Sequence, residues 1–200
     1  MCTAAKDPYA ITKLRSYDLP ERTKIPCTIS EAALATSAAS SFFDPVYIGD
    51  RQFVDGALGM NNPVESVEEE ACDIWCAKTR NIQPLVKCFI SIGTGKREKM
   101  AIQDKFLPFI RETLIKVTTE TEEKAKRFAS RWKGHSAQNR YFRLNVEQNL
   151  QDVGLADYKM QSVIEGATDQ YLDETQQILI LDNCVANLKQ KHGMYFKNLA

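Results

Sequence analysis

The chain is poor in histidine, has no long apolar run and carries no net charge. Its two histidines, His135 in a polar stretch and His192 near the end, are expected at the surface and outside any catalytic role. No segment approaches the roughly 18 apolar residues of a membrane-spanning helix, and the N-terminus has no apolar signal core. The 26 basic and 26 acidic residues cancel, so we expect no nucleic-acid partner.

Six cysteines are present, and they lie mostly inside predicted helices or strands: Cys2, Cys27, Cys72, Cys76, Cys88 and Cys184. Without a secretory signal, such cysteines are usually free buried thiols, which predicts a reducing, cytoplasmic setting. Cys72 and Cys76 are four residues apart on one predicted helix, but neither a histidine nor a second cysteine pair lies nearby to complete a zinc site. We therefore predict no metal and no cofactor.

The length and hydrophobicity suit one domain of the α/β class. A chain of 200 residues with 44% hydrophobic residues can furnish a single core. Alternation and apolar periodicity predict strands and helices that follow one another along the chain. The predicted strands cover residues 11–17, 46–48, 52–54, 85–92 and 141–146, and the predicted helices cover 29–40, 63–75, 102–131 and parts of 160–188.

Two of the predicted helices have clear start signals. Thr28 and Glu31 have the spacing of a capping box, in which hydroxyl and carboxylate each bind a free backbone amide. Asn62 can cap the next helix, with Pro63 in its first turn. Four acidic residues lie early in that helix, where the positive end of the helix dipole stabilises them. They are Glu65, Glu68, Glu69 and Glu70. We predict that they form a solvated face and not a metal site.

Asp55 is the main candidate functional residue. It comes directly after a predicted strand, residues 52–54, which itself follows a tight turn at residues 49–51. The next residues form a glycine-containing loop, Gly56-Ala57-Leu58-Gly59-Met60-Asn61-Asn62-Pro63. One interpretation is an Asp-Gly turn in which the carboxylate binds its own backbone. The other is a catalytic carboxylate presented from a rigid strand.

The loop resembles the aspartate motif of patatin-like phospholipases, in which Asp-Gly-Gly or Asp-Gly-Ala precedes Asn-Asn-Pro. Residues 31–43 resemble the Ala-Thr-Ser-Ala-Ala helix of the same family, with Ser40 where proline is frequent. Residues 89–95 resemble its Ser-Ile-Gly-Thr-Gly strand and turn. Residues 141–146 and 168–172 look like later elements of fungal members. These ordered matches span most of the chain.

The resemblance implies a lipid acyl hydrolase, of the phospholipase or acylglycerol lipase type, that acts through a Ser-Asp dyad. Asp55 would be the catalytic base, and Gly56 and Ala57 its motif loop. The substrate would be a lipid ester, and peripheral contact with a membrane is expected. The implied fold is part of a three-layer α/β/α patatin-like domain.

The family's nucleophile lies in a Gly-x-Ser-x-Gly elbow, a strained strand-to-helix turn that this sequence does not contain. Ser136 follows Gly134 by two residues, but Gln138 replaces the second glycine and the preceding residues are charged. The resemblance therefore implies that residues 1–200 are the C-terminal portion of a single patatin-like domain. Its N-terminal strands and elbow would be missing, so the fragment would be inactive alone and complemented by an N-terminal half. The alternative is a catalytically dead module for lipid binding, interaction or signalling.

Two further segments have alternative interpretations. The turn Gly93-Thr94-Gly95-Lys96 resembles the end of a phosphate-binding loop. That motif requires glycine where Ile90 stands and serine or threonine where Arg97 stands, so the spacing fails. We expect this turn to be structural. The charged run 120–131 is expected to be a solvated helical face, with a lid over a lipid-binding cleft as the alternative.

Overall fold

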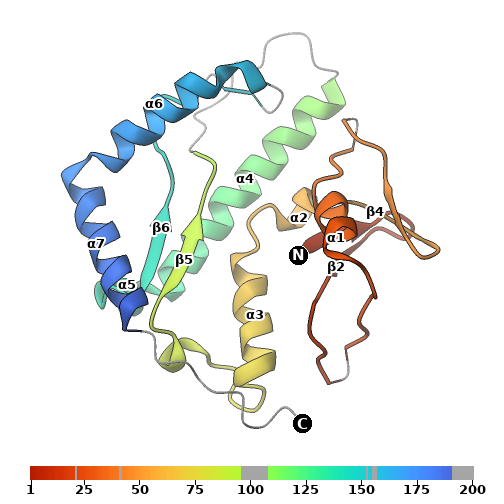
Figure 1. The fold of residues 1–200 in the computed structure, drawn as a ribbon, viewed down its shortest axis with the longest axis horizontal. Helices are drawn as coiled ribbons and strands as arrows, with labels where there is room; N and C mark the ends of the chain where they lie inside the picture. The colour runs from red at the N-terminus through yellow and green to blue at the C-terminus, as the bar shows by residue number, and fades with distance from the viewer. Residues whose placement is uncertain (21, 41, 96–107, 152, 155–156, 191–200) are drawn as a thin grey trace. The chain divides into compact units, whose positions relative to one another are not determined.

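The computed structural model describes residues 1–20, 22–40, 42–95, 108–151, 153–154 and 157–190 (Figure 1). Helices and strands are mixed along the chain, which confirms the α/β class. The chain forms two compact units. The first contains residues 1–82 and 104–128, and the second contains residues 83–103 and 129–200, each as far as it is described.

The first unit is built on a four-stranded antiparallel sheet with the strand order β2-β1-β4-β3. Its elements are β1 (Cys2–Ala5), β2 (Ala10–Lys13), α1 (Ile29–Thr36), β3 (Val46–Ile48), β4 (Arg51–Asp55), α2 (Ala57–Met60), α3 (Val64–Trp75) and most of α4 (Pro108–Arg131). The predicted hairpin is confirmed, and Gly49 at its turn has a φ of +59°, which glycine adopts without strain. The strand predicted over residues 11–17 is shorter and shifted, and β1 was missed because four small residues show little alternation.

The core of this unit lies between α1 and the sheet. Ala32 and Ala35 of α1 are buried against Phe53 of β4 and Ile48 of β3. Alanines have little bulk, so they allow α1 to approach the sheet closely. The core thus fixes the strand whose last residue is Asp55.

Both predicted helix starts are present, with small differences. Thr28 accepts a hydrogen bond from the Glu31 amide, and Glu31 accepts one from the Thr28 amide at 2.7 Å, so the capping box is confirmed. α1 ends at Thr36, earlier than predicted. α3 begins at Val64 with Pro63 as its N-cap, and Asn62 acts from one residue earlier by accepting a hydrogen bond from the Val64 amide at 3.3 Å.

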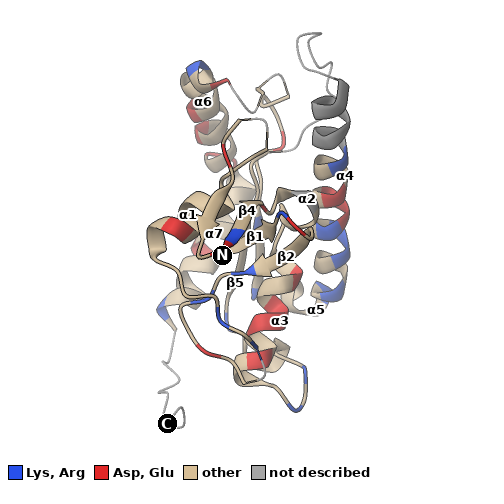
Figure 2. Ribbon diagram, turned by 90° about the vertical axis from the view of Figure 1, so that its right-hand side faces the viewer, with Lys and Arg blue, Asp and Glu red and all other residues tan. Residues whose placement is uncertain are grey.

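Acidic residues recur along α3 (Figure 2), but not all of their side chains are solvated. The side chain of Glu70 is 14% exposed and forms a bidentate ion pair with Arg15, at 2.5 and 2.6 Å. Lys13 and Tyr17 also contact it. The hydrogen bonds from Arg15 lower the pKa of Glu70 to about 2. The prediction of a solvated face was therefore wrong for Glu70, because its partners come from β2 and the residues after it.

The second unit contains a parallel pair of strands, β5 (Phe89–Ile92) and β6 (Tyr141–Leu144). Its helices are the end of α4, α5 (Lys133–Ala137), α6 (Gln161–Leu172) and α7 (Thr175–Lys189), with single 3₁₀ turns at Gln83–Leu85 and Tyr158–Met160. Trp132 is fully buried, and its ring lies 5.0 Å from Phe89 and 6.2 Å from Tyr141. The strand predicted from residue 85 begins at Phe89 because the 3₁₀ turn precedes it.

All six cysteines are free, as predicted, but only Cys72 and Cys184 are buried. The sulfur atoms of Cys88 and Cys184 lie 3.7 Å apart. No helix in the described part of the chain is long and apolar enough to cross a membrane. The charged run 120–131 is helical, as predicted, whereas the predicted helix start at residues 102–107 lies outside the described residues.

Candidate active site

Asp55 is the last residue of β4, a central strand with hydrogen-bonded neighbours on both sides. It pairs with Thr3 of β1. Its amide donates to the Ala38 carbonyl at 2.9 Å, which continues the hydrogen bonding of the strand into the segment after α1. The half-buried carboxylate is therefore presented from a backbone held on both sides.

The carboxylate caps the turn that follows it. Oδ1 of Asp55 accepts a hydrogen bond from the Ala57 amide at 2.8 Å, as the Asp-Gly turn interpretation predicts. Oδ2 has no hydrogen bond within the described residues. One oxygen thus orients the side chain, and the other is left for a further partner.

The environment of Asp55 favours proton uptake. Partial burial raises its pKa above the ordinary value of an aspartate, and the hydrogen bond from Ala57 lowers it by less. The pKa of the nearby Tyr9 phenol is also raised, first by burial and then by the charges of Glu120 and Asp55. A carboxylate with raised proton affinity is better matched to general-base work near neutral pH.

Gly56 is required by the close approach of the loop to β1. A Cβ at this position would lie 3.1 Å from the Cys2 carbonyl oxygen and 3.2 Å from the Thr3 Cα. Both are backbone atoms of a paired strand, so they cannot rotate away. Gly56 then begins the single turn α2, where the Met60 amide donates to its carbonyl at 3.0 Å.

Two threonines that the sequence did not single out attach α1 to this site. Thr3 is fully buried, and its hydroxyl lies 2.6 Å from the Val54 carbonyl oxygen and 3.1 Å from that of Ala35. Thr36 donates to the Cys2 carbonyl. The small residues of α1 allow these contacts. The sequence could have indicated Thr3 only if β1 and its pairing with β4 had been predicted, because that pairing is what places Thr3 opposite Asp55.

The other candidate segments have structural roles. Gly95, with a φ of +102°, donates from its amide to the Asn145 side chain at 3.0 Å, which fits the prediction that its turn is structural. Ser136 lies on α5, which follows a helix and not a strand, so its geometry is not that of a nucleophile elbow. His135 packs against Trp132. No cluster of three metal-ligating side chains occurs in the described ranges.

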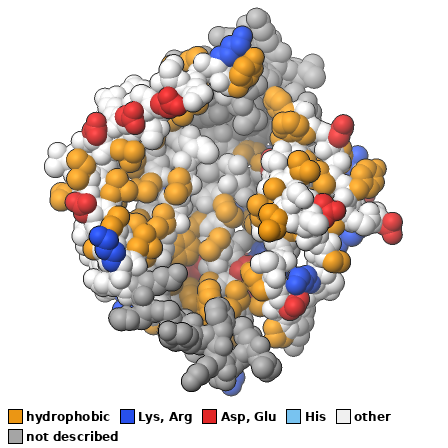
Figure 3. Space-filling view, viewed as in Figure 1, with side chains coloured by type: hydrophobic (Ala, Val, Ile, Leu, Met, Phe, Trp, Pro, Cys, Tyr) orange, Lys and Arg blue, Asp and Glu red, His pale blue; other side chains and the backbone are white. Residues whose placement is uncertain are grey.

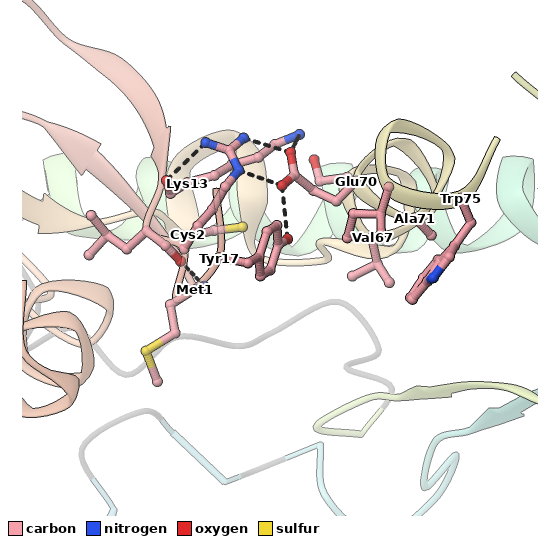
Figure 4. A pocket seen from close by; sticks show the side chains of 12 residues that line it. Met1, Cys2, Lys13, Tyr17, Val67, Glu70, Ala71 and Trp75 are labelled. Carbon is pink, nitrogen blue, oxygen red and sulfur yellow. Dashed lines mark hydrogen bonds and ion pairs between the residues drawn. The ribbon is translucent and has the colours of Figure 1, made fainter. Parts of the chain in front are cut away.

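A hollow of about 300 Å³ lies elsewhere on the first unit (Figure 4). Its apolar wall includes Val67, Ala71 and Trp75 of α3, and Cys2 and Leu14 lie across from them. Val67 and Trp75 are 50% and 45% exposed. Asp55 does not line this hollow.

Comparison with known families adds an independent result. Residues 3–67 match the sequence profile of the patatin-like phospholipase family. Residues 3–67, the patatin-like segment, are thus similar to patatin-like phospholipases. The matched residues include all of β1 except Cys2, together with α1, the hairpin that ends at Asp55 and Asn61-Asn62-Pro63. A search of curated proteins gives no match. The family resemblance is therefore confirmed for residues 3–67, while the resemblances at residues 89–95, 141–146 and 168–172 lie outside the matched range and stay predictions. The patatin-like segment coincides with the part of the first unit that holds Asp55.

We expect Gly56→Ala to destabilise the first unit by about 1–3 kcal/mol, since the added methyl meets strand backbone on β1. Chemical denaturation followed by exchange of the β1 amides measures this effect. Gly166→Ala is the matched control, because Gly166 lies within α6 with no atom within 4 Å of a built Cβ. That variant should be more stable by roughly 0.5–1 kcal/mol. Equal effects in the two variants would contradict the close approach.

Proposed function

We propose that this chain is the C-terminal portion of a single patatin-like domain that hydrolyses lipid esters, with Asp55 as the catalytic base. The proposal depends on how the Asp55 side chain is held at the end of β4. Its Oδ1 is held by the Ala57 amide, its Oδ2 is open among the described residues, and burial raises its pKa. The patatin-like segment supports lipid ester chemistry for a carboxylate so placed.

In the proposed reaction, Asp55 takes the proton of a serine hydroxyl as the serine oxygen attacks the ester carbonyl. Amide donors stabilise the oxyanion of the tetrahedral intermediate. The protonated Asp55 then returns its proton to the departing alcohol oxygen. In the second half of the reaction it activates water to release the fatty acid. The serine and the oxyanion donors belong to the N-terminal half of the domain, which is the proposed polypeptide partner.

Two surfaces support the proposal that further polypeptide completes the domain. A parallel sheet is normally covered on both faces and has more than two strands, yet Ile92 of the β5–β6 pair is 75% exposed. Apolar side chains are also exposed on α6 and α7 of the same unit (Figure 3). In the first unit, apolar side chains of α3 are exposed in the wall of the hollow, beside the Arg15–Glu70 ion pair that also lines it.

The setting of the reaction follows from the same proposal. Six free cysteines are compatible with the reducing conditions of the cytoplasm. A lipid ester substrate requires at least transient contact with a membrane or lipid droplet. A protein that binds such lipids without hydrolysing them is the alternative outcome of the test below.

The test compares the 200-residue chain with a longer form of the protein that also carries a Gly-x-Ser-x-Gly segment. The substrate is p-nitrophenyl butyrate, and release of p-nitrophenol is followed by absorbance. We expect hydrolysis by the longer form and none above background by the 200-residue chain. Hydrolysis by the 200-residue chain would reveal an unrecognised nucleophile. An inactive longer form that still binds phospholipid vesicles would instead indicate the non-catalytic module.

A further inference from the structure

The loop after Asp55 is held by α4. The Asn61 side-chain amide donates to the Thr121 hydroxyl at 2.8 Å, and that of Asn62 lies 3.4 Å from the Thr121 carbonyl. Lys124, one turn further along α4, donates to the Gly59 carbonyl. All these residues belong to the first unit. Three successive contacts therefore join residues 59–62 to one face of α4.

Further hydrogen bonds orient the side chains that join the loop 59–62 to α4. The Thr121 hydroxyl donates to the Val117 carbonyl at 2.7 Å, so its oxygen is oriented to accept from Asn61. Asn62 is buried, and its side chain joins the start of α3 at one end to α4 at the other. Lys124 donates to the carbonyl oxygen of Gly59, a residue with a φ of +94°.

These contacts bear on Asp55 through a short length of backbone. Ala57, whose amide holds the carboxylate, is the first residue of α2, and the Asn61 amide donates to the Ala57 carbonyl at 3.2 Å. A backbone hydrogen bond thus joins Asn61 directly to Ala57.

We infer that Thr121 and Lys124 are positioning residues, which fix the loop 59–62 so that the Ala57 amide holds Asp55 in its reactive orientation. The inference rests on the proposed function of Asp55. It also gives the charged run of α4 (Figure 2) a role beyond solvation, because Lys124 binds the motif loop, whereas Lys126 is exposed.

The test uses the 200-residue chain and needs no catalysis. Amide hydrogen exchange is measured by NMR in Thr121→Val and Lys124→Met, together with titration of the Asp55 carboxyl carbon. We expect the amides of Ala57, Met60 and Asn61 to exchange at least about tenfold faster in both variants. The pKa of Asp55 should fall toward its ordinary value, since a loosened loop admits water and burial is what raises it.

Matched variants separate positioning from general stability. Lys126→Met removes an exposed cation from the same helix and should leave exchange and the Asp55 titration unchanged. Thr121→Ser keeps the hydroxyl and should restore both. If Thr121→Val does not fold, Lys124→Met alone decides. Wild-type exchange and titration in the folded variants would overturn the inference.

The same variants in the longer form distinguish this inference from the proposed function. Misplacement of the base should lower kcat at least about tenfold with little change in KM. If the longer wild-type form does not hydrolyse esters while the loop exchange responds as expected, the proposed function fails and the positioning role stands. If hydrolysis occurs and neither kcat nor exchange responds to Thr121→Val and Lys124→Met, the positioning role fails alone.

Discussion

Replacing Asp55 by asparagine in the longer, serine-containing form should lower kcat/KM for p-nitrophenyl butyrate by at least about 100-fold, within the range typical of a lost general base. Asparagine can still accept the hydrogen bond from Ala57 through its amide oxygen, so the loop should keep its geometry. What it loses is the ability to take a proton. The predicted loss therefore lies in kcat, with KM nearly unchanged.

Asp50→Asn is the matched control, because Asp50 is an exposed aspartate in the turn between β3 and β4. This variant should retain wild-type activity. The Asp55 variant should also unfold at the same denaturant concentration as the wild type. Retention of most activity in a folded Asp55→Asn protein would exclude Asp55 as the base.

The pH dependence of the wild type provides a second measurement of the same group. The base must be ionised, so kcat/KM should fall as pH decreases through the pKa of Asp55. Because burial raises that pKa, the acid limb should lie above the value near 4 of an ordinary aspartate. A limb at or below that value would contradict a desolvated base.

The largest effect on stability is expected from Phe53→Ala, with a loss of about 3–5 kcal/mol in the free energy of unfolding of the first unit. Phe53 is fully buried on β4, two residues before Asp55, and packs with the alanines of α1. Its removal leaves a cavity that the small neighbouring side chains cannot fill. Chemical denaturation monitored by exchange of the β1 and β4 amides measures the loss.

Tyr47→Ala is the control for this substitution, because it removes an aromatic ring from the same sheet at a position that is 62% exposed. Its effect should stay below about 1 kcal/mol. A small effect of Phe53→Ala would mean that the core between α1 and β4 does not hold the strand that carries Asp55.

Local sequence signals predicted the elements best where the responsible interactions lie within a few residues. The capping box of α1 and the hairpin before Asp55 are of this kind, since their hydrogen bonds join residues close in sequence. Prediction was weaker for β1. Its four small residues form a strand only because β2 and β4 pair with it.

The candidate site divides in the same way. The sequence by itself determined the α/β class, the patatin-like motif, Asp55 at the end of a strand and the Asp-Gly turn that follows. Only the tertiary structure decided that Gly56 lies against β1, that Thr3 and Thr36 join α1 to the site and that Glu70 is ion-paired. It also brought Thr121 and Lys124 to the loop, across about 60 residues of sequence. The reason is physical: each of these contacts depends on register and packing between distant segments, which no local pattern specifies.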